Sequence, residues 1–302
     1  MRVSYTAGYH VPLPAKHPFP MGKFPALHEL LLREHIITPS DVVAPRMAEW
    51  SDLQRVHTTR YLTALAEGTL TRQAERRMGL PWSPALVVRS RLAVQGTINA
   101  MMMALEDGIA ANLAGGTHHA FADYGEGFCV LNDVAVGLHW LLASKWIRRA
   151  LVLDLDVHQG NGTAHVLRED SRVFTCSIHG AKNFPFRKEN SDLDIPLADG
   201  TADEDYLAVL QQTLPRLLTM TKPDLIVYLA GIDVMHDDRF GRLRLTFDGL
   251  YRRDLAVLKW THQAQIPVCL LLSGGYAPTP EETANRHAQC HRAARDVYGF
   301  GL

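Results

Sequence analysis

The sequence predicts an α/β fold in one domain, with helices on both faces of a mainly parallel β-sheet. Two observations predict it. Short, β-rich apolar runs alternate with longer helical stretches along most of the chain. These runs are apolar at consecutive positions, as in strands that are buried on both faces. Helices between such strands serve as crossover connections, which make neighbouring strands parallel.

The elements can be placed in chain order from residue type and periodicity. The first 35 residues are rich in proline, which restricts the backbone, so we expect an ordered loop wrapped on the body of the domain. A helical pattern follows from about residue 86 to about residue 106. We expect strands at 109–114, 150–157, 173–178, 225–230 and 268–272. We expect further helices at 131–144, 162–168, 204–220, 247–263 and 280–296.

Composition indicates a globular protein, whose balanced charge leaves room for a local basic patch. The 302 residues carry a formal net charge of -1, so no basic surplus indicates nucleic-acid binding. The first ten residues do not resemble a signal peptide, and no apolar run reaches the roughly 20 residues of a membrane span. We therefore expect a cytoplasmic protein that binds neither membrane nor nucleic acid. The sequence gives no indication of oligomeric state.

The cysteines indicate buried thiols in a reducing compartment. They lack the CxxC spacing of a zinc or redox site, and most lie in or beside apolar runs. One of them follows Gly127-Phe128 and could be imagined as a nucleophile, but its apolar neighbours favour a structural thiol. The four cysteines are Cys129, Cys176, Cys269 and Cys290.

Polar residues follow nearly every predicted strand. In open parallel sheets, ligands bind at the carboxyl ends of the strands, so these side chains should gather at one edge. They are Gly115 to His119 after the first strand, Asp154, Asp156 and His158 at the end of the second, Ser177 and His179 in the third, Gly231 to Asp233 after the fourth, and Ser273 to Tyr276 after the fifth.

Asp154, Asp156 and His158 carry the strongest chemical signal. Because strand side chains alternate, the three should point to the same side. Buried carboxylates are costly unless they are compensated, and a cation compensates them well. Asp156 and His158, with Asp233 as a plausible third ligand, would suit a catalytic zinc with an open position. The alternatives are a capping cluster for the helix after Gly162 and, for Asp233, a loop cap.

Two further groups could supply the remaining chemistry. His118 and His119 follow glycines that allow a tight turn, and they could act as general base and general acid. Each needs an orienting partner, for which Asp154 and Asn161 are candidates. Tyr276 follows a glycine pair and could donate a hydrogen bond to an oxyanion. The alternative is an aromatic ring that only packs over a loop.

The motifs at these positions resemble the ordered signature of the histone deacetylase family, over essentially the whole chain. The resemblance begins with His17 to Lys23 near the start. The branch that looks most similar is the class IV type with its bacterial relatives, on the segments Tyr228 to Gly241 and Arg252 to Asp254. The shared motifs are Gly115-Gly-Thr-His-His-Ala120, Gly125-Glu-Gly-Phe-Cys-Val-Leu-Asn-Asp133, Asp154-Leu-Asp-Val-His-Gln-Gly-Asn-Gly162, Ala230-Gly-Ile-Asp233 and Ser273-Gly-Gly-Tyr276.

The resemblance implies an arginase/deacetylase-type three-layer fold, as a single catalytic domain over residues 1–302. It implies zinc on Asp156, His158 and Asp233, and iron(II) would fit the same ligands. It implies that His118 and His119 are the acid/base pair, backed by Asp154 and Asn161, and that Tyr276 polarises the carbonyl. It implies a substrate tunnel at Gly127, Phe128, Gly274 and Gly275, with Phe184 or Phe186 opposite. It also implies a structural potassium near Asp154, Asp156, His158, Ser177 and Ile178.

The function that follows is zinc-dependent hydrolysis of an amide, removing an acetyl or longer acyl group from acyl-lysine in a protein or peptide. The alternatives are a small acylated amine such as an acetylpolyamine, or a non-catalytic relative that binds acylated ligands. An arginase-like site with two metals would need more ligands than Gln159 and Asn161 can supply.

Asn161 stands where class I members have aspartate, which should leave His119 less basic. Residues 70–84 show no clear equivalent of the acid that grips the substrate backbone.

Overall fold

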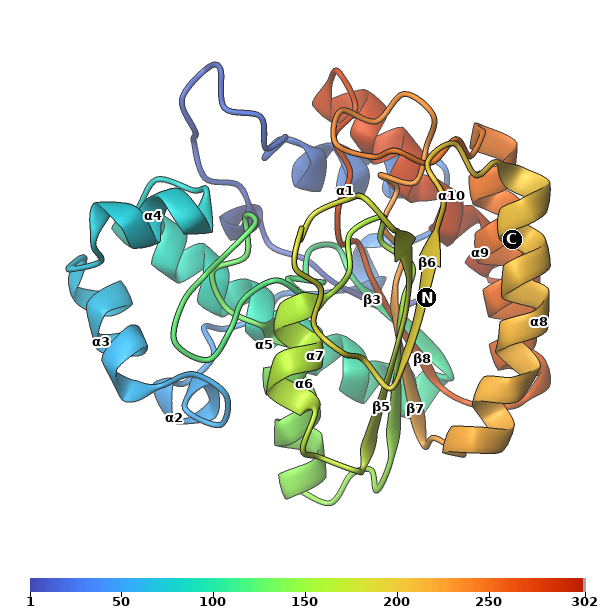
Figure 1. Cartoon of the computed structure of the whole chain (residues 1–302), viewed down its shortest axis with the longest axis horizontal. Coiled ribbons are helices and arrows are strands. Elements are labelled where there is room, and N and C mark those ends of the chain that lie inside the picture. The colour runs from blue at the N-terminus through green and yellow to red at the C-terminus, as the bar shows by residue number, and fades with distance from the viewer. Residues whose placement is uncertain (301–302) are drawn as a thin grey trace.

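A computed structural model describes residues 1–300 of the chain, and within them it shows one eight-stranded sheet (Figure 1). Neighbouring strands are parallel throughout, in the order β2-β1-β3-β8-β7-β4-β5-β6. The predicted fold class is therefore confirmed. The last two residues of the predicted domain, 301–302, lie outside the described residues. The strands are β1 Val3–Ser4, β2 Val42–Val43, β3 Ile109–Asn112, β4 Ala150–Asp154, β5 Val173–Gly180, β6 Leu193–Leu197, β7 Leu225–Leu229 and β8 Val268–Leu271.

Helices cover both faces of the sheet because its central strands are apolar on both faces (Figure 1). On β4, Leu151 and Leu153 pack into a core shared with α1, α8, α9 and α10, whereas Val152 packs into a second core shared with α5 and α6. The helices are α1 Lys23–Arg33, α2 Trp50–Leu53, α3 Thr59–Glu67, α4 Arg72–Met78, α5 Pro84–Asp107, α6 Asp133–Ala143, α7 Asn161–Leu167, α8 Asp203–Thr221, α9 Phe247–Gln263 and α10 Pro280–Tyr298, with 3-10 turns at Ala7–Tyr9 and Pro39–Asp41.

The N-terminal segment differs from its prediction. We expected a loop over the first 35 residues, but α1 covers Lys23–Arg33 and β1 joins the sheet at Val3–Ser4. Pro25 does not prevent the helix, because it lies in the first turn, where no backbone N–H is needed for an intrahelical bond. The buried side chains Phe24, Leu27 and Leu31 then hold the helix in the core, where α1 packs against α10.

The second predicted strand also ends earlier than expected. β4 stops at Asp154, so Asp156 and His158 lie in the loop that follows rather than on the strand. Beyond β4, the Leu155 N–H still donates to the carbonyl of Leu229 at 3.1 Å, and the Gly180 N–H donates to the carbonyl of Val157 at 2.9 Å. After that point the chain turns toward the loops that follow β7 and β8, and this turn brings its polar side chains to the sheet edge.

The prediction that the cysteines are buried free thiols is confirmed. All four are free and buried, and burial raises the pKa of the Cys129 thiol well above its ordinary value. A protonated, enclosed thiol does not act as a nucleophile. Among residues 1–300, no helix is both long and apolar enough to cross a bilayer.

A buried histidine should make the fold sensitive to acid. His57 is 2% exposed, and its Nε2 accepts a hydrogen bond from the Asn132 N–H at 3.0 Å. Burial lowers the pKa of His57 to about 4, against about 6.5 in an unfolded chain. Between pH 6.5 and pH 4 the unfolded state therefore binds more protons, so stability is complete above pH 6.5, falls as the pH drops from 6.5 toward 4, and loses nothing further from this group below that.

We expect His57→Gln, which keeps an acceptor but cannot titrate, to reduce this loss. Between pH 7.5 and pH 5 the free energy of unfolding of the variant should fall by about 2 kcal/mol less than that of the parent protein. Urea unfolding at both pH values measures the difference. An identical pH dependence for the two proteins would show that His57 is not the titrating group.

Candidate active site

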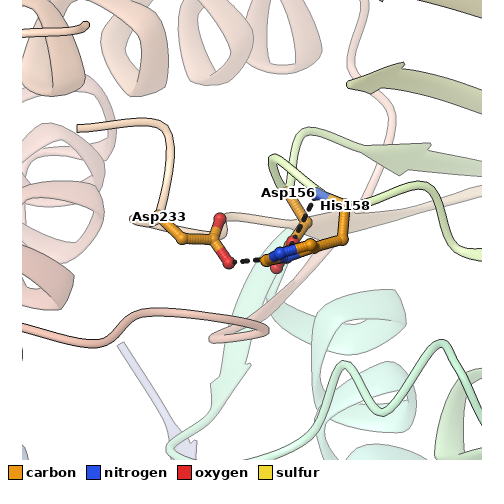
Figure 2. Close-up of side chains that lie close together, drawn as sticks. All are labelled: Asp156, His158 and Asp233. Atoms are coloured by element: carbon orange, nitrogen blue, oxygen red, sulfur yellow. Dashed lines mark hydrogen bonds and ion pairs between the residues drawn. The ribbon is translucent and has the colours of Figure 1, made fainter. Parts of the chain in front are cut away.

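Three ligand-type side chains meet at the carboxyl edge of the sheet. Asp156 and His158 come from the loop after β4, and Asp233 comes from the loop after β7 (Figure 2). Each is buried and offers one ligand atom, and these atoms all lie within 4.8 Å of one another. The alternative interpretation of these residues as loop caps does not account for this convergence. Within residues 1–300 this is the one group of its kind.

The charges of this cluster are strongly coupled. His158 Nδ1 lies 3.0 Å from Asp156 Oδ1 and 3.2 Å from Asp233 Oδ2. Burial lowers the pKa of His158, but the two carboxylates outweigh it and raise the pKa to about 10. Burial and the charge of Asp156 raise the pKa of Asp233 to about 7. A proton on His158 thus offsets part of the negative charge of the two carboxylates, and a cation at the same point would replace that proton.

Backbone groups hold the two carboxylates in place. The Gly274 N–H donates to Asp156 Oδ2 at 2.6 Å, and the Val157 N–H donates to Asp233 Oδ1 at 2.9 Å. A side chain at position 274 would collide with both carboxylates, so this position requires glycine. Each acid therefore keeps one oxygen bound to the backbone while its other oxygen is part of the cluster.

Arg253 ties together the two loops that carry the ligands, a role that our sequence analysis missed. Its Nη1 donates to the carbonyl of Gly231 at 2.6 Å and to that of Leu155 at 3.3 Å. Its Nε donates to Asp254 Oδ1 at 2.9 Å, which keeps the fully buried guanidinium paired. Leu155 directly precedes Asp156, and Gly231 lies two residues before Asp233, so Arg253 fixes the separation of the two loops beside the ligands.

The two neighbouring histidines lie beside the cluster on a tight turn. Gly115 and Gly116 have φ angles of 77° and 78°, which suit glycine. Asp133, at the start of α6, accepts hydrogen bonds from the N–H groups of Gly116 at 3.0 Å and Thr117 at 2.7 Å. This carboxylate fixes the turn that presents His118 and His119, and our sequence analysis gave it no role.

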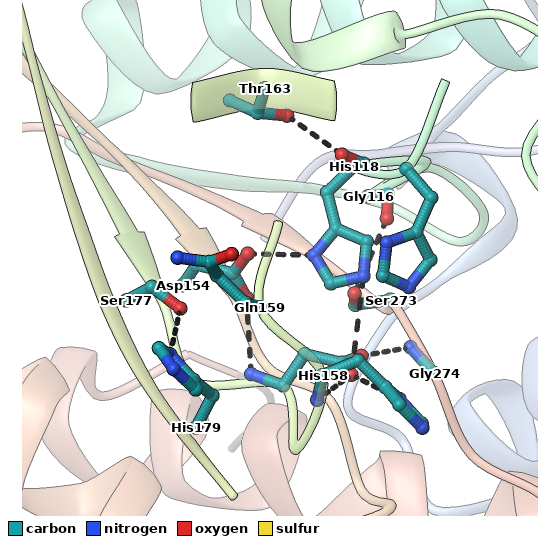
Figure 3. Close-up of polar contacts among 12 residues, drawn as sticks. Gly116, His118, Asp154, His158, Gln159, Thr163, Ser177, His179, Ser273 and Gly274 are labelled. Carbon is teal, nitrogen blue, oxygen red and sulfur yellow. Dashed lines mark hydrogen bonds and ion pairs between the residues drawn. The ribbon is translucent and has the colours of Figure 1, made fainter. Parts of the chain in front are cut away.

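Both histidines lie within hydrogen-bond distance of the partners predicted for them. His118 Nδ1 lies 2.6 Å from Asp154 Oδ2 (Figure 3), and His119 Nδ1 lies 2.7 Å from Asn161 Oδ1. Burial lowers the pKa of His118, but Asp154 and Asp156 outweigh it and raise the pKa to about 9. Burial and the positive charges of His118 and His158 lower the pKa of His119 well below its usual value. The pair thus divides into one charged and one neutral imidazole.

Asn161 is itself held in one orientation. Its Nδ2 donates to Glu126 Oε2 at 3.0 Å, so its Oδ1 faces His119 as an acceptor. His119 must then carry its proton on Nδ1, which leaves Nε2 bare. The ring of His119 lies with its centroid 5.9 Å from that of His158. A neutral imidazole with a free Nε2 therefore lies beside the ligand cluster.

Tyr276 lines the same cavity as His119 and His158. Its ring centroid is 5.8 Å from that of Phe128 and 4.8 Å from that of Phe240. Its backbone N–H donates to Asp238 Oδ2 at 2.7 Å, which anchors the loop that follows β8. Burial raises the pKa of Tyr276 well above its ordinary value, so the phenol keeps its proton and can act as a donor.

A cavity of about 550 Å³ connects this site with the surface. His119, His158 and Tyr276 line its deep end. Phe128 and Phe184 line it higher up, and the ring of Phe184 lies 5.0 Å from that of His119. Phe186 is 88% exposed, so Phe184 is the wall opposite Phe128. Of the glycines in the predicted tunnel, Gly127 lines this cavity and Gly274 an adjoining one, whereas Gly275 is buried against Ile232.

The remaining predicted residues lie behind the site. Ser177 pairs in register with Asp154 on the adjacent strand, and its Oγ lies 2.9 Å from His179 Nδ1 (Figure 3). Ile178 is its buried neighbour on β5. Gln159 donates to the carbonyl of Glu189 and to Asp194, so its amide supports a loop and adds no ligand to the cluster.

Comparisons with known proteins fit this fold and site. The family model described as "Histone deacetylase domain" matches residues 17–292. An uncharacterized protein of Picosynechococcus sp. is 47% identical over 98% of this chain and 99% of its own length. Histone deacetylase 2 of Arabidopsis thaliana is 30% identical over 86% of this chain and 70% of its own. The acetoin utilization protein AcuC of Staphylococcus aureus is 28% identical over 78% of this chain and 66% of its own length.

A solved structure agrees with them on the fold. The crystal structure of the HDA15 HD domain superposes with a TM-score of 0.79 at 19% identity, covering all of this chain and 93% of its own. Fold, site and relatives together define the class as a deacetylase-like hydrolase that acts on amides. The chain belongs to the histone deacetylase family.

Proposed function

We propose that this protein is a zinc-dependent deacylase that hydrolyses the side-chain amide of an acyl-lysine, acetyl or longer, in a protein or peptide. One observation supports this above the others. Asp156 and His158 of the ligand cluster line one cavity together with His119 and Tyr276, and Asp233 lies beside them in the cluster. Groups for binding a metal, moving a proton and stabilising an oxyanion are thus within reach of one substrate atom.

The donor set fits the proposed metal. Two carboxylates and one imidazole, buried and within 4.8 Å of one another, would hold Zn²⁺ and leave a position open for water or substrate. Iron(II) would fit the same ligands. When bound, such an ion polarises a carbonyl and lowers the pKa of water.

The histidines would handle the proton. Because Nε2 of His119 is bare, it can take a proton from the attacking water as the water adds to the acyl carbon. The same nitrogen can then pass that proton to the lysine nitrogen as the C–N bond breaks. His118 is held by the carboxylate of Asp154 and retains positive charge, which favours the negative charge that develops on the acyl oxygen.

Tyr276 would donate a hydrogen bond from its hydroxyl to that oxygen. The apolar walls formed by Phe128 and Phe184 would hold the alkyl stem of the acyl-lysine and exclude water around it. We also propose a structural potassium near Asp154, Asp156, His158, Ser177 and Ile178, supported by the pairing of Asp154 with Ser177 across β4 and β5.

A peptide assay tests the proposed reaction. We expect zinc-loaded protein to release the acyl group from an acyl-lysine peptide with neutral flanking residues. A series from acetyl to long fatty acyl chains, followed by mass spectrometry, would define the preferred chain length. Hydroxamate binding without turnover of any member of the series would contradict the proposal and favour the non-catalytic alternative.

A further inference from the structure

The outer rim of the catalytic cavity is strongly basic. Four cationic side chains line it, and all are exposed to solvent. They come from separate parts of the chain, namely α4, the loop after β5 and the loop that precedes α9. Among the described residues, Glu126 is the one carboxylate in the lining. The cations are Arg76, Arg77, Lys182 and Arg242.

Neighbouring acids do not neutralise this rim. Arg77 Nε lies 3.9 Å from Glu126 Oε1. Lys182 and Arg242 share one carboxylate, that of Asp199, at 3.9 Å and 3.3 Å. Arg76 forms no ion pair within residues 1–300. Exposed pairs at these distances are weak, so the rim keeps a positive surplus that a ligand can use.

The basic character extends to residues 70–84, which have no clear equivalent of the acid that grips the substrate backbone. α4 places Arg76 and Arg77 on the rim of the mouth. Its one acid, Glu75, lines a neighbouring pocket together with Arg72 and Arg76 and does not line this cavity. The charged side chains that α4 presents to this cavity are therefore cationic.

Any acyl-lysine must enter past this rim, because its amide has to reach His119 and Tyr276 at the deep end. The residues on either side of the lysine then remain at the mouth, within about one Debye length of the cations. Acidic neighbours would be attracted there and basic neighbours repelled. A polyamine, whose remaining amines are cationic, would meet the same repulsion.

We infer that the site selects acyl-lysines flanked by acidic residues and discriminates against basic peptides and acetylpolyamines. This inference rests on the proposed deacylase function and specifies its substrate class. The selection acts during encounter and binding, because the cations lie at the mouth and not at the reacting atoms. Its signature is therefore a difference in KM that weakens as salt is added.

Three peptides test this inference. They carry the same acyl-lysine with aspartate, serine or lysine on both sides, and kcat/KM is measured at low and at high salt. We expect kcat/KM at low salt to be roughly tenfold higher for the acidic than for the basic peptide, with the ratio shrinking in high salt. Acetylputrescine should be turned over more slowly than the serine peptide.

Variants assign the effect to the rim. Arg76→Glu combined with Lys182→Glu alters two exposed side chains and should abolish or reverse the preference. Arg216→Glu changes an exposed arginine on α8, at the opposite side of the molecule from α4 (Figure 1), and should leave the preference unchanged. Thermal unfolding checks that the variants are folded. The peptide series on the unaltered protein tests the substrate preference even if a variant does not fold.

The outcomes separate this inference from the function on which it rests. Turnover of the serine peptide with equal or higher kcat/KM for the basic peptide would overturn the inference and leave the deacylase proposal intact. Failure to turn over any of the three peptides would overturn the deacylase proposal itself. A preference for acidic flanks that survives in the doubly substituted protein would also overturn the role of this rim.

Discussion

Replacing His119 with alanine is expected to lower kcat by about 10²–10⁴-fold, the usual contribution of a positioned general base. The effect should fall on kcat because the imidazole acts on the water and on the leaving nitrogen, while the acyl-lysine stem binds against Phe128 and Phe184. Steady-state kinetics on one acyl-lysine peptide, with zinc content measured in parallel, provides the test.

The structure gives a specific reason to choose His119 rather than its neighbour as the base. Glu126 fixes the Asn161 amide, and the amide fixes the proton of His119 on Nδ1. His118 instead faces the carboxylate of Asp154. His262→Ala, an exposed histidine at the end of α9, serves as the matched control and should retain full activity. If the kcat of the His119→Ala protein lay within a few-fold of the parent's kcat, His119 would have no role in the proposed reaction.

Tyr276→Phe should cost about 10²–10³-fold in kcat, which corresponds to about 2.7–4 kcal/mol for one lost oxyanion donor. The substitution preserves the ring that packs against Phe128 and Phe240, and Asp238 still holds the backbone N–H. We therefore expect little change in KM or in thermal stability. The same kinetic assay measures the loss, and unfolding curves show whether the fold is intact.

Tyr251→Phe provides the comparison for Tyr276. This tyrosine lies on α9 and donates to Asp296, away from the cavity, so removing its hydroxyl should leave kcat unchanged. Equal activity of the Tyr276→Phe protein and its parent would mean that Tyr276 only packs over the loop.

The central fold was predictable because its signals are local. β4, β7 and β8 are apolar at consecutive positions, and the helices between them begin and end within a few residues of their predicted bounds. The outer elements lack such signals. β6 is largely half-buried and contains Pro196, and β1 and β2 have two residues each, so none of them shows a strand pattern.

The site residues also fall into those that local sequence patterns indicate and those that they do not. Asp156, His158 and Asp233 could be predicted because ligand-type residues at strand ends are conspicuous and match a family motif. Asp133, Asp238 and Arg253 act through hydrogen bonds to backbone groups far away in the sequence, which no spacing indicates. The roles of the site residues, the choice of metal and the similarity to the class IV branch stay predictions.

Titration calorimetry of zinc binding to the metal-free protein tests the central claim most directly. We predict one Zn²⁺ per chain, with binding lost in Asp233→Ala and retained in Asp237→Ala, whose carboxylate pairs with Arg286 outside the cluster. Undiminished binding in Asp233→Ala, or no binding to the parent protein, would contradict the proposal that Asp156, His158 and Asp233 hold one catalytic ion.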